Sequence, residues 1–150
     1  MFEDFIKKIL MDYSAVGKFS FWASPEPFAH YSEEGKTTEK NYLPDLLYDH
    51  YEKYGRDYAR GILDMKNKTS SSFSNADIYQ MNFYSQALKC KKVILCYPYG
   101  GNKPPNILRF DDERLYLQKI FSVYFNLVGN SAAEFKANIK RFVQQVDGLI

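Results

Sequence analysis

Cysteine and histidine are scarce in this sequence, and their scarcity excludes several classes of protein. Only two cysteines, Cys90 and Cys96, and two histidines occur among the 150 residues. Two cysteines cannot form the disulfide framework that holds small secreted domains together. Their spacing fits no zinc motif, and too few histidines are present to complete one. We therefore expect a cytoplasmic protein with reduced cysteines.

Long apolar runs and a large excess of one charge are also missing. Lys and Arg number 20 against 18 Asp and Glu, so the net charge is only +2. A chain this close to neutrality is not a strongly basic protein that covers nucleic acid. Any contact with nucleic acid must come from a local basic patch. No apolar run approaches the roughly 18 to 20 residues that a membrane span needs. The opening segment Met1–Phe5 is not typical of a signal peptide, so we expect no membrane partner.

Two common arrangements for catalysis and nucleotide binding are absent as well. The sequence contains no Gly-x-x-x-x-Gly-Lys-[Ser/Thr] loop, so we expect no GTP or ATP site of the P-loop type in this chain. No Ser-His-Asp arrangement can be identified. His30 and His50 stand alone, and we interpret them as surface or core residues.

The residues that are present predict one globular domain over residues 1–150. Hydrophobic residues make up 45% of the chain and charged residues 25%, a balance that excludes a disordered protein. Periodicity and turn signals predict the elements and the polar loops between them. We expect helices at Phe2–Met11, from Ser74 or Asn75 to about Leu88, and at Ser131–Val146; strands at Lys18–Ala23, Leu43–Tyr48, Tyr58–Lys66, Val93–Tyr97, Ile107–Phe110 and Arg114–Phe121; an exposed loop or hairpin tip at Ser32–Asn41; and a polar hairpin connector at Asp49–Asp57. This order predicts an α/β or α+β fold with a central mixed sheet.

Three residues on two neighbouring predicted strands carry the clearest signal for chemistry. Asp64 and Lys66 are two apart on one strand, so their side chains share a face. Asp45 follows Pro44 on the neighbouring strand of the presumed hairpin, and two carboxylates brought together there would repel each other without a cation. Oxygen ligands suit Mg²⁺ or Mn²⁺ rather than zinc, and a lysine beside the metal can stabilise charge on a phosphate. The pattern predicts phosphodiester cleavage, and an exposed strand face with one ion pair is the alternative.

The predicted helix after these strands adds polar residues on one face. Gln80 and Tyr84 are four residues apart, and Asp77 shares their face. The alternative interpretation is a half-buried helix face that packs on the sheet.

Together these motifs resemble the PD-(D/E)xK nuclease superfamily, in the branch with a Gln-x-x-x-Tyr helix motif. They look most like the C-terminal nuclease domain of McrC-type subunits, from modification-dependent McrBC restriction systems. The matching segments follow in the same order as in those proteins: Phe2–Phe5, Leu43–Asp45, Ile62–Lys66 and Asp77–Tyr84. The resemblance implies an α/β fold with a restriction-endonuclease-like core, in which helices flank a central mixed sheet. The second acidic position is Asp where many superfamily members have Glu, which is within the family's pattern.

The resemblance also implies a role for each matched residue and a set of partners. Asp45 and Asp64 would be metal ligands, Lys66 the catalytic lysine, and Glu3 an additional acidic ligand, direct or through water. The implied activity is that of a Mg²⁺-dependent endodeoxyribonuclease, with Mn²⁺ as a substitute, and cleavage of both DNA strands would need two copies. McrC-type subunits bind a McrB-type GTP-hydrolysing AAA+ partner through an N-terminal region, and we expect that region to be absent here.

The remaining assignments leave alternatives open. By resemblance, Gln80 and Tyr84 would support the site or contact the DNA backbone. Instead of a nuclease, the chain could be a non-catalytic nuclease-fold module that binds DNA or a partner. It could also be a RecB-like repair nuclease, although two cysteines cannot supply the four ligands of an iron–sulfur cluster. Three lysines after the second helix are interpreted as a solvated helix end, with phosphate contact as the alternative: Lys89, Lys91 and Lys92.

Overall fold

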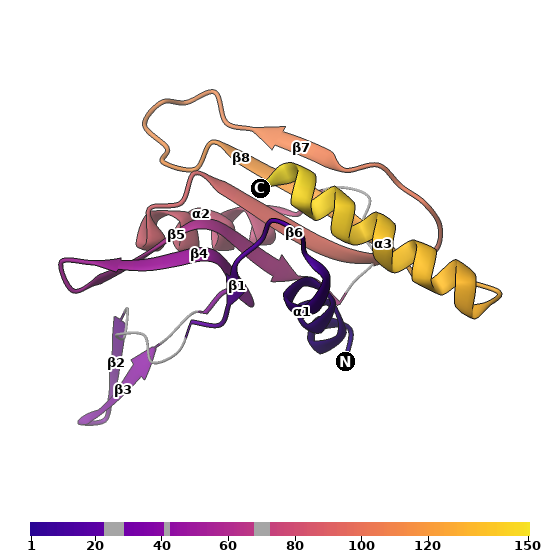
Figure 1. Cartoon of the computed structure of the whole chain (residues 1–150). Coiled ribbons are helices and arrows are strands. Elements are labelled where there is room, and N and C mark those ends of the chain that lie inside the picture. The colour runs from indigo at the N-terminus through magenta and orange to yellow at the C-terminus, as the bar shows by residue number, and fades with distance from the viewer. Residues whose placement is uncertain (23–28, 41–42, 68–72) are drawn as a thin grey trace.

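A six-stranded mixed sheet forms the centre of the protein (Figure 1). The computed structural model describes residues 1–22, 29–40, 43–67 and 73–150. The elements in chain order are α1 (Phe2–Tyr13), β1 (Phe19–Ser20), β2 (Ala29–Glu33), β3 (Lys36–Lys40), β4 (Leu46–Lys53), β5 (Arg56–Met65), α2 (Asn75–Leu88), β6 (Lys92–Tyr99), β7 (Asn106–Arg109), β8 (Lys119–Asn126) and α3 (Ala132–Leu149). The strand order is β1-β4-β5-β6-β8-β7, and β6 runs parallel to both β5 and β8 while the other pairs are antiparallel. This confirms the predicted central mixed sheet flanked by helices.

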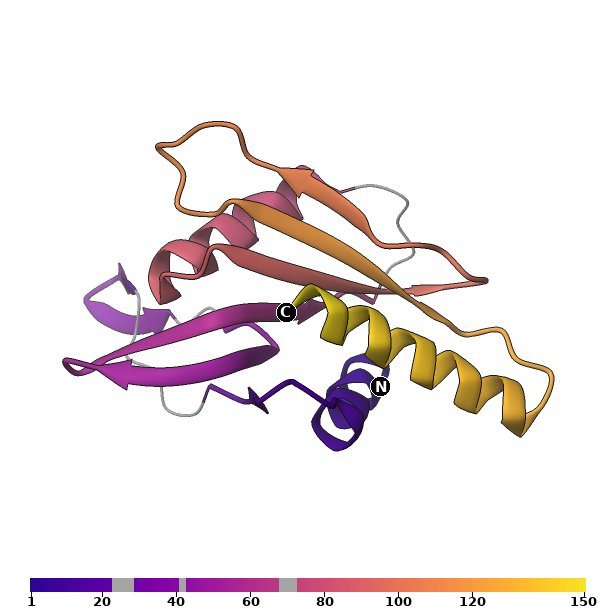
Figure 2. The same cartoon turned by 45° about the horizontal axis from the view of Figure 1, so that its top comes forward.

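Helices cover both faces of this sheet (Figure 2). Residues of α1 and α3 pack on one face, and residues of α2 pack on the other. The central strand β6 alternates accordingly, with Ile94 and Cys96 facing α1 and α3 while Val93 and Leu95 face α2. Because β6 is buried on both sides, its sequence is a nearly continuous apolar run, and the prediction of a doubly buried strand is confirmed.

The three predicted helices are all present. Ser74 is the N-cap of α2, where its side chain accepts a hydrogen bond from the backbone N–H of Asp77, and Ser131 caps α3 in the same way. Helix α1 extends two residues beyond its expected end, to Tyr13. In the part of the chain that the structure describes, no helix is both long and apolar enough to cross a bilayer.

The predicted strand Arg114–Phe121 was wrong in most of its length. Arg114 instead lies in a turn, where its backbone N–H and its guanidinium both bond the carboxylate of Asp112. The strand, β8, begins at Lys119 and pairs with β6 along all eight of its residues. Since β8 is buried on both faces, its sequence lacks the alternation that would have located it.

The two polar segments form hairpins, as expected, but strands occupy more of each segment than predicted. The predicted connector Asp49–Asp57 is mostly strand, because β4 and β5 are joined by a two-residue turn at Tyr54 and Gly55, whose φ angles are 52° and 71°. Positive φ at both positions is the geometry of a tight hairpin turn. The predicted loop or hairpin tip Ser32–Asn41 coincides largely with the β2–β3 hairpin, although Asn41 lies outside the described residues. The predicted strand Lys18–Ala23 is reduced to β1, with Ala23 outside the described residues.

Candidate active site

Asp64 and Lys66 lie together at the carboxyl end of β5. Their side chains share the face that carries Ile62, as the two-residue spacing predicted, and Lys66 Nζ is 2.6 Å from Asp64 Oδ2. The backbone N–H of Lys66 bonds the carbonyl of Cys96, which fixes this end of β5 against β6. Asp64 is only 5% exposed, and the ammonium group of Lys66 is its close ionic partner.

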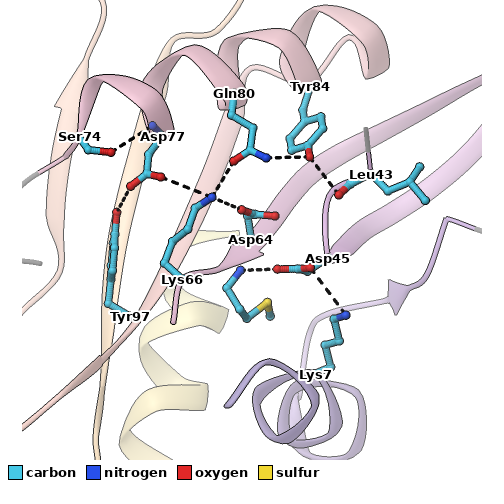
Figure 3. A network of polar contacts seen from close by, with 11 residues as sticks. Lys7, Leu43, Asp45, Asp64, Lys66, Ser74, Asp77, Gln80, Tyr84 and Tyr97 are labelled. Atoms are coloured by element: carbon cyan, nitrogen blue, oxygen red, sulfur yellow. Dashed lines mark hydrogen bonds and ion pairs between the residues drawn. The ribbon is translucent and has the colours of Figure 1, made fainter. Parts of the chain in front are cut away.

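Asp45 comes from the neighbouring strand end and faces the same place (Figure 3). The register pairs Leu46 with Leu63, so Asp45, one residue before β4, comes beside Asp64. Its Oδ2 accepts a hydrogen bond of 2.6 Å from the backbone N–H of Met65. Burial and the negative charge of Asp64 raise the pKa of Asp45 to about 7, although the hydrogen bond from Met65 opposes this change. The two carboxyl groups therefore repel each other at this position.

Helix α1 brings Glu3 and Lys7 to the outer side of Asp45. Lys7 Nζ donates a hydrogen bond to Glu3 and lies 3.7 Å from Asp45 Oδ1. The hydrogen bond from Lys7 lowers the pKa of Glu3, and burial opposes it. Glu3 thus lies next to Asp45, but its carboxylate is engaged by Lys7. No motif in the sequence singles out Lys7, although it lies four residues after Glu3, the spacing at which helical side chains meet.

Helix α2 holds the ammonium group of Lys66 from the other side. Gln80 Oε1 accepts a hydrogen bond of 2.7 Å from Lys66 Nζ, and Gln80 Nε2 donates one to the hydroxyl of Tyr84. Tyr84 in turn donates to the backbone carbonyl of Leu43, two residues before Asp45. Burial and the charge of Asp64 raise the pKa of Tyr84 to about 12, so its hydroxyl keeps the proton it donates. Gln80 and Tyr84 therefore support Lys66 and tie α2 to the segment that carries Asp45.

Asp77 and Tyr97 extend this network beyond the residues that the sequence assigned to the site. Asp77 Oδ1 lies 3.5 Å from Lys66 Nζ, and the hydroxyl of Tyr97 donates a hydrogen bond of 3.1 Å to Asp77 Oδ2. Burial alone would lower the pKa of Lys66, but its hydrogen bond to Asp64 and the charges of Asp64 and Asp77 outweigh it and raise the pKa. Lys66 is therefore held as a cation. The face that Asp77 shares with Gln80 signalled its position, whereas nothing in the local sequence singled out Tyr97.

The donor set fits a hard divalent cation better than any other metal. Two carboxylates from different strands, Asp45 and Asp64, are the residues that could hold it, and a cation between them would relieve their repulsion. Mg²⁺ keeps several waters and needs only one or two protein carboxylates. Among the described residues, no three His, Cys, Asp or Glu side chains form a ready-made metal cluster.

The comparisons with known proteins show a likeness in fold to a solved structure. No protein-family model matches the sequence, and no curated protein matches it either. The fold is similar to a chain of a solved half-complex from the tetradecameric assembly of Thermococcus gammatolerans McrB AAA+ hexamers with bound McrC, with a TM-score of 0.62 and 17% identity. The likeness covers 99% of this chain and 32% of that one, so this chain spans about a third of its neighbour's length. The chain therefore shares its α/β fold, with a mixed sheet flanked by helices, with a chain of that complex.

Proposed function

We propose that this chain is a divalent-metal-dependent DNA endonuclease domain and the nuclease component of a McrBC-like restriction system. The observation that carries the proposal is the convergence of two carboxylates and a lysine at the adjacent ends of β4 and β5. Lys66 lies 2.6 Å from Asp64, and the strand register puts Asp45 beside Asp64, where burial and the charge of Asp64 raise the pKa of Asp45 to about 7. Metal-bound carboxylates beside a fixed ammonium group are suited to hydrolysis of a phosphodiester.

Each residue has a stated part in this chemistry. Asp45 and Asp64 would hold Mg²⁺ or Mn²⁺, and the ion would act as a Lewis acid on the phosphate. Lys66 would orient the attacking water and stabilise the negative charge that develops on the phosphate oxygens. Gln80 and Asp77 would act as positioning residues, since both contact Lys66 Nζ rather than the substrate.

The geometry also offers a way for a substrate to approach. A hollow of about 390 Å³ is lined by Ala76, Asp77, Gln80 and Phe83, so it opens beside the residues that hold Lys66. Phe83 is 43% exposed there and could contact a nucleotide. This arrangement supports access from the side of α2.

The restriction-system role is supported by the fold likeness and by the order of the motifs along the chain. The similar chain belongs to an assembly of McrB AAA+ hexamers with bound McrC, so we propose a McrB-type GTP-hydrolysing subunit as the partner. This chain spans only 32% of that neighbour's length, so the partner is proposed from the fold likeness and the motif order together. Two copies would meet to cut both strands of DNA.

The test is cleavage of plasmid DNA with Mg²⁺ or Mn²⁺, with metal binding measured by calorimetry. Asp64→Ala and Lys66→Ala should each lower the cleavage rate by about 100-fold or more. The exposed residues Asp111 and Lys136 provide matched controls, and their Ala variants should cut like the wild type. Asp64→Ala should also lose metal affinity, whereas Lys66→Ala should retain it.

Three results would decide between the alternatives. Metal-dependent cutting that both site variants lose would establish the nuclease. Metal binding without cutting by any form would indicate a domain that needs its partner subunit. No cutting and no metal binding would refute the proposal and favour a non-catalytic nuclease-fold module.

A further inference from the structure

A basic hollow lies away from the candidate active site, at the amino end of β6. Its volume is about 480 Å³, and four cationic side chains line it together with the ring of Tyr116: Arg60, Lys89, Lys91 and Lys92. The cations come from β5, from the segment that joins α2 to β6 and from the first residue of β6, so the tertiary structure gathers them in one place. The three lysines therefore line a concave surface and are more than a solvated helix end.

The positive charge of this basic hollow is only partly compensated. Lys89 and Lys91 lie over the ring of Tyr116, at 5.3 and 5.9 Å from its centroid, and Lys92 donates a hydrogen bond to a backbone carbonyl. Among the described residues, none of the three lysines has a carboxylate within ion-pair distance, and only Arg60 has one, Asp49 at 3.1 Å. Burial lowers the pKa of Lys92, and the charge of Lys119 acts in the same direction. An anion in the hollow would be attracted to the four cationic side chains that line it.

The position of the basic hollow relates it to the proposed substrate. Arg60 lies five residues before Met65 on β5, a separation of about 16 Å along an extended strand. The register brings Lys92 beside Gly61, so the lysines lie at the same level of the sheet as Arg60. Duplex DNA advances about 3.4 Å per base pair, so it would cover the distance from the hollow to the active site in about five base pairs.

We propose that the basic hollow binds the phosphodiester backbone of duplex DNA about five base pairs from the bond that is cut. Lysines bind phosphates as point charges and fix the register of a protein on DNA without reading its sequence. The hollow would thereby hold the duplex against the active site. This inference rests on DNA as the proposed substrate, but it does not depend on catalysis.

The test is binding of a short DNA duplex, measured by fluorescence anisotropy without divalent metal at several salt concentrations. Lys89→Gln combined with Lys91→Gln should weaken binding about tenfold and reduce the slope of log K against log salt by about 2. Arg60→Gln is a second, independent variant and should reduce the slope by about 1. All three side chains are exposed, so melting temperatures should stay unchanged.

The matched control carries the same loss of charge elsewhere on the surface. Lys136 and Lys140 are exposed on α3, and Lys136→Gln with Lys140→Gln should leave the affinity within about twofold of the wild type. Hollow variants that bind DNA as the control does would overturn the inference. If inorganic phosphate or a mononucleotide saturates the hollow while the variants keep their affinity for duplex DNA, the hollow binds a small anion instead. That result would also overturn the inference.

Failure of this inference can be distinguished from failure of the proposed function. A chain that neither cuts DNA nor binds metal, but loses duplex affinity in the hollow variants, would contradict the nuclease and support the basic hollow. A chain that cuts DNA with metal, but binds it equally well in every hollow variant, would support the nuclease and overturn the hollow.

Discussion

Replacing one acidic residue of the candidate site should stabilise the metal-free protein while removing the proposed nuclease activity. In Asp45→Asn, the carboxyl that burial and Asp64 bring to a pKa of about 7 is replaced by a neutral amide. The ordinary pKa of this group is 3.8, so the folded state binds its proton more tightly than the unfolded state does. Stability therefore falls as the pH rises from about 4 to about 7, because folding then opposes ionisation of Asp45. The side-chain amide that replaces the carboxyl does not ionise, so the variant does not lose this stability as the pH rises.

The size of the effect follows from the structure. A difference of about three in pKa corresponds to about 4 kcal/mol, which is an upper bound. The Asp45 side chain is 18% exposed, and the variant loses the charge interaction with Lys7 at 3.7 Å, so we expect a net gain of about 2 kcal/mol at pH 8. The side-chain amide of the variant would still offer an oxygen to the backbone N–H of Met65, so that hydrogen bond survives. For a chain of this size the gain corresponds to about 4 to 8 °C in melting temperature.

The assay is urea unfolding of the wild type and the variant at pH 4 and pH 8, with EDTA and then with Mg²⁺. The variant should be clearly more stable than the wild type at pH 8, and the two proteins should be almost equally stable at pH 4. Mg²⁺ should stabilise the wild type more than the variant, because the cation relieves the same repulsion. Asp111→Asn, at an exposed position, is the control and should show no such pH dependence. An Asp45→Asn protein that is less stable at pH 8, or equally stabilised at both pH values, would refute the reasoning.

Three further variants test the supports of the site and the core. Tyr97→Phe removes the hydroxyl that donates to the buried carboxylate of Asp77, so we expect a loss of about 1 to 3 kcal/mol in urea unfolding and a several-fold slower cleavage; unchanged values for both would contradict the network. Ser74→Ala removes the side-chain cap of α2 and should cost about 1 kcal/mol, with Ser74→Asp as the variant that restores it. Ile6→Ala empties a fully buried position between α1 and the sheet and should cost about 2 to 5 kcal/mol, and a loss well below that range would mean that α1 packs loosely.

Much of the fold could be predicted from the sequence because its signals are local. The helical periodicity of α1 and α3, and the apolar run of β6 between polar segments, each lie within one stretch of chain. The strand β8 was misplaced because its apolar residues face both layers, so neither alternation nor turn residues mark its start at Lys119. What positions β8 is its parallel pairing with β6, which lies more than 20 residues earlier in the chain.

Part of the candidate site could likewise be predicted from the sequence, and part of it could not. The sequence predicted that Asp64 and Lys66 share a face, since side chains of a strand alternate, and it placed Gln80 and Tyr84 on one face of α2. It did not predict the contact of Tyr97 with Asp77, because the two residues belong to different elements and meet only when α2 packs on the sheet.

The sequence by itself determined which residues share a face of each helix and strand, because the helical and strand periods are set by the local backbone. Only the tertiary structure decided which of those faces meet. Strand register brought Asp45 beside Asp64 and gave Asp45 its raised pKa, since charge repulsion and desolvation depend on distance and burial. The same packing turned three lysines after α2 and one arginine of β5 into a basic hollow, although they lie about 30 residues apart in the chain.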